Sequence, residues 1–387
     1  METRRLSSAS AFLLLSSIVV SFLAASTAPS PLYSLYREIW GFSALMLTFV
    51  FAIYAFALLA GLLVFGALSD HVGRRPVLLG ALVLELGSLL IFWSADGVSC
   101  LIAARLMQGL ATGIATAALS AGLLDLHRER GALINSVAPM LGMALGALGA
   151  STLVQFAPAP AHRTFEVLGA VLALQAVLAL WLPETVRPRP GVWASLRPRL
   201  AVPQPALPTL RTILPMNTAQ WALGGFYMSL GPTLAKTVSG ISAPLVGGSL
   251  LATLVLSGAA GIMCLRTRPA RSALTLSAAA LVAGLVITIG GIQAHRAVLL
   301  FAGSAIAGAG FGAGFNASVR SLVPLAPAEQ RGAMMASFFV LSYLAFSVPA
   351  LGAGLAAGRY GLESTALGYA GVLVALCAWA GLKLSRA

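Results

Sequence analysis

The stretch FALLAGLLVFGALSDHVGRRPVLLGALVLELGSLL, residues 56–90, holds two apolar runs on either side of one short polar segment. The polar segment carries Asp70, His71, Arg74 and Arg75, and the run that follows contains a single charged residue, Glu85. A helix needs about 20 mostly apolar residues to cross the hydrocarbon core of a bilayer, and both runs reach that length when followed outward. The stretch therefore predicts two membrane-spanning helices joined by a turn of a few residues.

The whole chain repeats this pattern. Of its 387 residues, 59% are hydrophobic and 9% are charged, whereas soluble domains carry about 25% charged residues. No stretch shows the ten-residue alternation of a transmembrane β-barrel. We therefore expect an all-α membrane protein with twelve transmembrane helices, at about 10–28, 43–68, 76–95, 99–124, 132–155, 164–182, 211–235, 241–265, 272–293, 297–322, 333–357 and 363–383.

A segment rich in Pro and Arg interrupts the chain near its midpoint, and the two halves resemble each other. We expect an N-terminal six-helix bundle at 1–183, a cytoplasmic linker at 184–210 and a C-terminal six-helix bundle at 211–387. The sequence GLATG at 109–113 in the first half corresponds to GAGFG at 308–312 in the second. Internal repeats of this kind are common in secondary transporters, which bind substrate between the repeats.

The net charge of +13 comes from loops between apolar runs. A nucleic-acid-binding protein gathers its basic residues on a solvated patch, so we expect no nucleic-acid partner. Cytoplasmic loops retain Lys and Arg, and placing the N-terminus inside assigns eighteen of the 24 basic residues to that side. This asymmetry predicts a multi-pass protein of an inner (plasma) membrane, with both termini in the cytoplasm.

The polar loop has its own physical demands. Gly66 would allow two helices to approach closely, and Gly73 would allow a tight turn. Asp70 is suited to a helix N-terminus, and Arg74 and Arg75 would anchor the loop on the cytoplasmic side. Asp125, at the end of the fourth run, either pairs with Arg74 or Arg75 or is a solvated loop acid.

The loop resembles the signature G-x-L-x-D-x-x-G-R-R of the major facilitator superfamily at Gly66, Leu68, Asp70, Gly73, Arg74 and Arg75. The resemblance implies two bundles that rock about a central substrate site. It also implies that Asp70 docks at the start of the eleventh helix and holds one conformation of the transport cycle. The alternative is that these charges only fix the topology.

Arg105 cannot be placed in a loop. It lies in ARLMQGLATG, residues 104–113, which is similar to the second motif of the same superfamily. A charge at this depth costs at least about 2.5 kcal/mol and marks function by default, and Gln108 lies one turn away on the same face. Arg105 and Gln108 are therefore candidates for substrate binding or coupling. The alternative is a structural ion pair near the outer interface.

Glu85 lies near mid-membrane, about nine residues past Pro76. Burial disfavours its charged form, so Glu85 is a candidate proton carrier. The alternatives are a structural carboxyl that is protonated or a partner of Arg105. Two features weaken the proton-coupled reading: GMALGALGAS from Gly142 lacks the Gly-Pro pair of drug/proton antiporters, and the first run contains no acid.

Polar and aromatic residues inside the other spans complete the candidate substrate cavity: Asn217, Gln220, Trp221, Tyr227, Asn316 and Tyr343. Amides at depth need hydrogen-bond partners, which a ligand in a cavity provides; bonds between helices are the alternative. No Walker loop and no zinc-protease motif occurs in the sequence. We therefore expect no catalytic residues, no cofactor and no metal.

These features together predict a secondary active transporter of a small organic solute, working as a monomer. The resemblance to short-loop members of the superfamily that carry the first two motifs favours efflux over uptake, and protons are a candidate coupling ion. A sugar or nutrient permease acting as a uniporter or symporter is the main alternative. A non-transporting membrane receptor is a remote one.

Overall fold

A computed structural model describes residues 5–386, and within that range every regular element is a helix. The first half contains α1 (Ser8–Thr27), α2 (Pro29–Trp40), α3 (Ala44–Phe65), α4 (Leu68–Val72), α5 (Arg74–Trp93), α6 (Val98–Leu126), α7 (Arg128–Phe156), α8 (Pro160–Ala179) and α9 (Val192–Ser195). The second contains η1 (Gln204–Ala206), α10 (Leu207–Ser229), α11 (Gly231–Ser239), α12 (Pro244–Leu265), α13 (Ala270–Gln293), α14 (Ala297–Leu322), η2 (Val323–Leu325), η3 (Ala328–Gln330), α15 (Arg331–Tyr360) and α16 (Leu362–Arg386).

Length and hydropathy qualify eleven helical segments of the described chain as membrane spans. They match eleven of the twelve predicted runs, and α10 with α11 follows in the place of the run at 211–235. This segment is less apolar because Arg211, Asn217 and Gln220 interrupt it. The prediction of an all-helical membrane fold is confirmed. Helix α10 begins at Leu207, earlier than predicted, because Pro208 is well tolerated in a first helical turn.

The first predicted span is interrupted after Thr27. Helix α1 begins after Ser7, whose hydroxyl accepts a hydrogen bond from the backbone N–H of Ser10. Helix α2 then starts at Pro29, which has no backbone N–H to offer the carbonyl of Ala25 one turn earlier. The helix resumes to Trp40, twelve residues beyond the predicted end of the first run. The break leaves a carbonyl oxygen that must find another donor.

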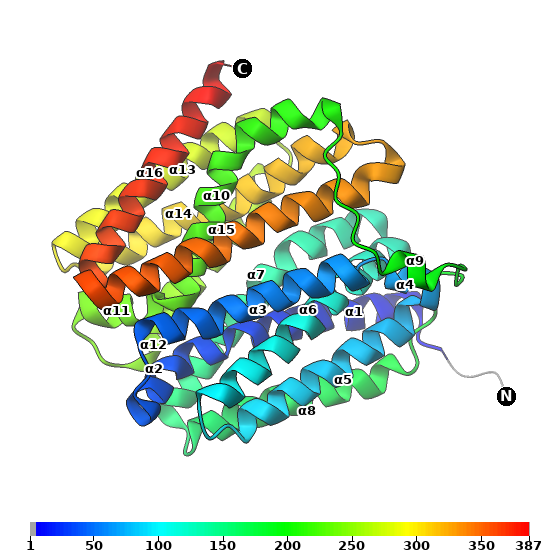
Figure 1. The fold of residues 1–387 in the computed structure, drawn as a ribbon, viewed down its shortest axis with the longest axis horizontal. Helices are drawn as coiled ribbons and strands as arrows, with labels where there is room; N and C mark the ends of the chain where they lie inside the picture. The colour runs from blue at the N-terminus through cyan, green and yellow to red at the C-terminus, as the bar shows by residue number, and fades with distance from the viewer. Residues whose placement is uncertain (1–4, 387) are drawn as a thin grey trace. The chain divides into compact units, whose positions relative to one another are not determined.

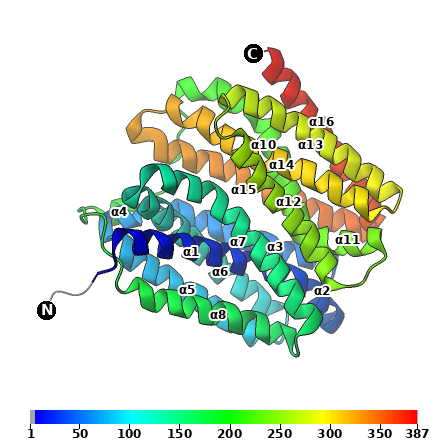
Figure 2. The same ribbon diagram turned by 180° about the vertical axis from the view of Figure 1, so that it is seen from behind.

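The described residues form two compact units. Unit 1 comprises the chain up to Leu32 together with Ile53–Arg199, and unit 2 comprises Tyr33–Ala52 together with Leu200 onward. Within unit 1, α5 packs on both α6 and α8, and α1 packs on α7; Figure 2 shows α5 beside α8. Within unit 2, α13 lies between α14 and α16, as Figure 1 shows.

The glycines of the internal repeat make the same helix contact in both units. A Cβ atom on Gly109 or Gly113 of α6 would collide with the carbonyl oxygens of Tyr54 and Leu58 on α3. In unit 2, a Cβ atom on Gly308 or Gly312 of α14 would collide with the carbonyl oxygens of Leu254 and Gly258 on α12. Small residues four apart allow two helix backbones to approach closely. The repeat seen in the sequence is therefore a repeat of helix packing.

The glycine-rich sequence of α7 has a packing role as well. A Cβ atom on Gly142 would collide with the carbonyl oxygen of Val20 on α1, and one on Gly146 with that of Ala24. The Thr27 hydroxyl lies at the same contact and donates to the carbonyl of Met143, at 3.0 Å. The last two turns of α1, just before the break, thus pack closely against α7.

Candidate functional site

Three predicted site residues meet in the interior of unit 1. Arg105 Nη1 donates to Gln108 Oε1 at 2.7 Å, and Gln108 Nε2 donates to Glu85 Oε1 at 3.1 Å. All three side chains have 0% exposure. The prediction that Arg105 and Gln108 share one face of their helix is confirmed. Gln108 bridges the guanidinium of α6 to the carboxyl of α5, and Glu85 Oε2 has no hydrogen-bond partner among the described residues.

The side chains of Arg105 and Gln108 also donate hydrogen bonds to carbonyl oxygens at the break in α1. Gln108 Nε2 donates to the carbonyl oxygen of Ala25 at 3.1 Å, and Arg105 Nη1 donates to that of Ser26 at 2.8 Å. The Ala25 carbonyl is the one that Pro29 leaves without a helical donor. A buried carbonyl without a partner costs about 1–3 kcal/mol, so these bonds stabilise the interrupted helix.

Aromatic rings surround the Arg105 guanidinium. Its central carbon lies 5.1 Å from the ring centroid of Tyr54 on α3 and 5.9 Å from that of Phe92 on α5. A desolvated cation over a ring gains about 2 kcal/mol. Carbonyl, amide and ring contacts together make a charge tolerable at this depth. The part of Arg105 and Gln108 in substrate binding or coupling stays a prediction.

In unit 2, the predicted residue Trp221 lies at the centre of an aromatic cluster. Its ring meets Tyr343 at 4.8 Å, Phe315 at 5.6 Å and Phe346 at 5.9 Å, each edge to face. Trp221, Phe315 and Tyr343 are half-buried, so helices α10, α14 and α15 together present an aromatic face. The sequence named Trp221 and Tyr343 and missed Phe315 and Phe346.

The predicted amides of α10 lie close to this aromatic face. Asn217 Nδ2 donates to the Ser342 hydroxyl at 2.9 Å, and Gln220 Nε2 donates to the Gly310 carbonyl at 3.3 Å. The other amide atom of each, Asn217 Oδ1 and Gln220 Oε1, has no hydrogen-bond partner among the described residues. Each amide therefore donates a hydrogen bond that joins two helices, and its oxygen accepts none from the described residues.

Two further candidates in unit 2 lie outside the Trp221 ring contacts. Tyr227 is buried, and its hydroxyl shares a hydrogen bond of 2.6 Å with the Ser304 hydroxyl of α14. This bond joins α10 to α14. Hydrogen bonding between helices was the alternative to a substrate cavity for polar residues inside the spans. Asn316 is half-buried on α14, next to Phe315 in the chain.

The signature loop forms a charge cluster in unit 1. Arg74 pairs with Asp70 at 2.5 Å and with Asp125 at 3.2 Å. Of the alternatives left open for Asp125, the structure shows the ion pair with Arg74. Asp70 lies in the first turn of α4, and Gly73 between α4 and α5 has φ +110°, which favours glycine. The docking of Asp70 at the eleventh helix stays a prediction.

Gly66 lies between the end of α3 and the start of α4. A Cβ atom there would collide with the carbonyl oxygen of Leu62, one turn earlier in the same segment. The glycine therefore permits the turn from α3 into α4. The close approach of two separate helices at Gly66 stays a prediction.

Glu184 completes the cluster, although its function was not expected from the sequence. Its two carboxylate oxygens accept hydrogen bonds from the backbone N–H groups of Arg74 at 2.8 Å and Arg75 at 3.1 Å. Helix α5 begins there without a side-chain cap from the preceding Gly73, and a carboxylate at a helix N-terminus is favourable. Gly73 has no side chain with which to cap α5, but the sequence does not indicate which residue takes that place.

Comparisons with known proteins identify the family of the chain. A family model described as Major Facilitator Superfamily matches residues 13–348. The multidrug resistance protein MdtL of Salmonella paratyphi B is 25% identical over 292 residues, which cover 70% of this chain and 69% of that protein.

Two solved structures show the same fold at low sequence identity. The human organic anion transporter MFSD10 is 18% identical, with a TM-score of 0.65 over 95% of this chain and 99% of that one. The proton:xylose symporter XylE is 13% identical, with a TM-score of 0.72 over 98% of this chain and 95% of that one. The family match spans most of the sequence, and the protein belongs to the Major Facilitator Superfamily of multi-pass membrane transporters.

Proposed function

We propose that the protein exports a small organic solute with an aromatic or flat apolar group, by alternating access. The observation that carries this proposal is the half-buried aromatic face of unit 2, centred on Trp221. The similarity to MdtL, whose name describes a multidrug resistance protein, supports export over uptake.

The chemistry of this face supports the choice of solute. Aromatic rings bind apolar surfaces and other rings through edge-to-face and offset contacts. The unused acceptors Asn217 Oδ1 and Gln220 Oε1 would take hydrogen bonds from the N–H or O–H groups of a solute that reaches them. Many apolar contacts with a few polar ones are typical of a site for an organic molecule.

The proposal includes the setting and the energy source. We place the protein in the inner membrane as a monomer with both termini in the cytoplasm, since its basic residues gather on one side. We also assign Glu85 as the proton carrier. It is a carboxyl at 0% exposure with one oxygen unpaired among the described residues, and it is linked through Gln108 to the broken helix α1.

A thermal-stability panel tests the assignment of the solute. A ligand that binds the folded protein raises its melting temperature, so aromatic compounds, hydrophobic drugs, sugars and carboxylates are compared. We expect shifts from the first two classes, and Trp221→Ala to weaken their binding about tenfold, which corresponds to about 1.4 kcal/mol. Trp379→Ala is the matched control, because Trp379 is 50% exposed on α16 and has no ring contact with the cluster among the described residues.

The outcomes separate the proposal from its alternative. Shifts from sugars alone, unchanged in Trp221→Ala, would replace the exporter with a nutrient permease. Accumulation of the identified compound in inside-out vesicles would support export, and accumulation in right-side-out vesicles would support uptake.

A further inference from the structure

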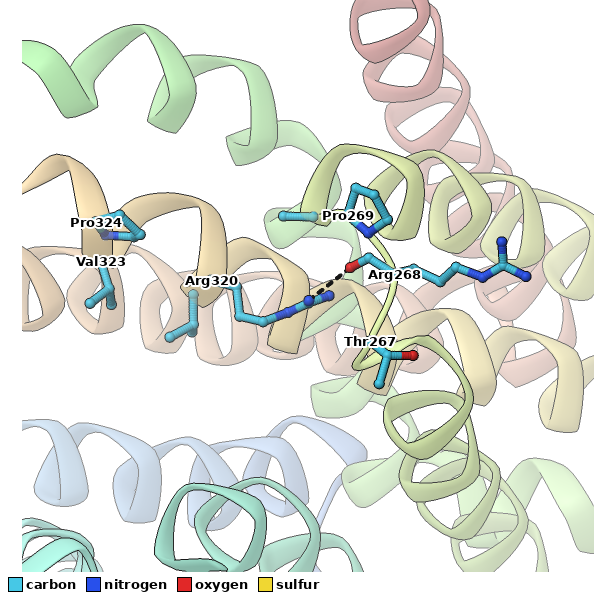
Figure 3. Close-up of a pocket in the computed structure, with 8 residues that line it drawn as sticks. Thr267, Arg268, Pro269, Arg320, Val323 and Pro324 are labelled. Carbon is cyan, nitrogen blue, oxygen red and sulfur yellow. Dashed lines mark hydrogen bonds between the residues drawn. The ribbon is translucent and has the colours of Figure 1, made fainter. Parts of the chain in front are cut away.

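A cavity of about 690 Å³ opens in unit 2 between the α12–α13 loop and the end of α14. Figure 3 shows the Arg320 side chain of α14 reaching toward the loop residues Thr267, Arg268 and Pro269, with Val323 and Pro324 farther along the chain and the Arg268 side chain extending away from α14. The Arg320 guanidinium lies against the loop, and the Arg268 side chain adds a second positive charge beside the cavity; most of the remaining lining is apolar. The cavity shares no lining residue with the aromatic face, although Val319 lies one turn after Phe315 on α14, and the proposed transport chemistry does not use it.

Arg320 fixes the shape of this cavity. Its Nη1 atom donates to the carbonyl oxygens of Arg266 at 2.8 Å and Arg268 at 2.9 Å, and its Nη2 atom donates to that of Leu265 at 3.2 Å. The dashed line in Figure 3 marks the bond to Arg268. Three carbonyls hold the guanidinium in place without neutralising its charge. Arg320 Nε has no hydrogen-bond partner within residues 5–386.

The corresponding loop of unit 1 supplies its own anions, and this loop does not. Arg74 is paired with Asp70 and Asp125. The segments 265–272 and 316–325 contain four arginines, Arg266, Arg268, Arg271 and Arg320, and no Asp or Glu. Arg271 also binds a carbonyl, that of Leu384 at 3.2 Å. The cavity therefore concentrates positive charge that nothing in these segments balances.

We propose that this cavity binds the phosphate of an anionic phospholipid headgroup. Guanidinium groups bind phosphate through paired, charge-assisted hydrogen bonds, and basic pockets at the cytoplasmic ends of transmembrane helices suit anionic headgroups. Helix α13 starts beside the cavity without a side-chain cap, so its first N–H groups add to the attraction for an anion.

A lipid fits this cavity better than free phosphate. The candidate spans Pro244–Leu265, Ala270–Gln293 and Ala297–Leu325 all end here, which is the level of the headgroups. Apolar side chains follow in the neighbouring turns of the spans, where Met263 is 43% exposed and Leu276 is 49% exposed. A lipid can place its phosphate on the arginines and its acyl chains along these residues.

Lipid titration of the purified full-length protein, read by native mass spectrometry, tests the proposal. The probes are phosphatidylglycerol, phosphatidylcholine and inorganic phosphate. Arg268→Gln is the main variant, because the exposed Arg268 side chain makes no hydrogen bond within the described chain and its loss should leave the melting temperature unchanged. Arg359→Gln is the matched control, an exposed arginine at the other end of a span.

We expect the wild type to prefer phosphatidylglycerol over phosphatidylcholine. Each arginine near an anionic headgroup contributes about 1 kcal/mol, so Arg268→Gln should weaken phosphatidylglycerol binding about fivefold, and Arg359→Gln should not change it. Equal losses in both variants, or none in Arg268→Gln, would overturn the site. Binding of inorganic phosphate that depends on Arg268, without a preference for phosphatidylglycerol, would overturn the lipid assignment. The readout does not involve transport, so a failed exporter proposal would leave it unaffected.

Discussion

The two halves of the chain use the same glycine contacts and place different chemistry next to them. In unit 1, Gly109 packs on α3, and one turn before it Arg105 joins α6 to the Ser26 carbonyl of α1. In unit 2, Gly308 packs on α12, and one turn before it Ser304 joins α14 to Tyr227 of α10. Ser304 follows Arg105 by 199 residues, the same interval that separates Gly308 from Gly109.

The comparison shows that this helix junction does not require a charge. A bond between two hydroxyl groups holds α14 to α10, whereas α6 and α1 are joined by an arginine, a glutamine and, through them, a carboxyl. A buried charge is costly and marks function by default. We propose that the charge in unit 1 serves transport, in line with the role proposed above for Glu85.

Removing the joining side chain should have the largest effect in unit 1. Arg105→Ala leaves the Ser26 carbonyl and Gln108 Oε1 without their donor in a buried region. Breaking a buried charged network costs about 3–5 kcal/mol, whereas Tyr227→Phe in unit 2 should cost about 1 kcal/mol of unfolding free energy. Chemical denaturation in detergent measures both. Equal losses of unfolding free energy in the two variants would show that the charged junction of unit 1 stabilises the fold no more than the hydroxyl bond of unit 2.

The glycine contacts should respond alike in both halves. Gly113→Leu and Gly312→Leu each force a side chain against a facing backbone carbonyl, and overpacking costs about 1–3 kcal/mol. Gly371→Leu is the control, since nothing lies within 4 Å of a Cβ atom there. The melting temperatures of the three variants test the repeat. A large loss in one half alone would show that the two contacts are not equivalent.

Glu85→Gln tests whether the charge in unit 1 serves coupling. The amide keeps the shape of the carboxyl and cannot carry a proton, so we expect flux driven by a pH gradient to fall at least about tenfold, with ligand binding retained. Ser88→Ala is the control, because Ser88 is equally buried and bonds to the backbone of Glu85. Unchanged flux in Glu85→Gln would leave the carboxyl with a structural role.

The smallest effect on stability is expected at the signature loop. The side chain of Asp70 is 46% exposed, and exposed ion pairs contribute about 0–1 kcal/mol. Asp70→Asn should therefore leave folding and ligand affinity nearly unchanged, and it should lower the transport rate by shifting the balance between conformations. Rates in reconstituted vesicles and melting temperatures are compared. A loss of folding that matches the loss of rate would assign Asp70 a structural role.

The fold could be predicted from the sequence because its determinants are local. Apolar length fixes the spans, and Arg105 and Gln108 meet because they lie on one helix face. Contacts between distant segments could not be predicted. The spacing of residues in the sequence does not indicate that the Glu184 carboxylate lies at the start of α5 or that Gln108 bonds to the Ala25 carbonyl. The aromatic face was half predicted, since Trp221 and Tyr343 stood out as polar-edged rings and Phe315 looked like any apolar residue.

The break in α1 also has a consequence during biosynthesis, because the hydrogen-bond donor for its carbonyl is synthesised later than α1 itself. The Ala25 carbonyl receives its donor from Gln108, 83 residues later in the chain. At synthesis rates of about 5–20 residues per second, α1 waits about 4–17 s in the translocation channel or the bilayer before that donor is made. During this interval water or the insertion machinery must satisfy the carbonyl. Helix α1 therefore reaches its final hydrogen bonding only after α6 has been made.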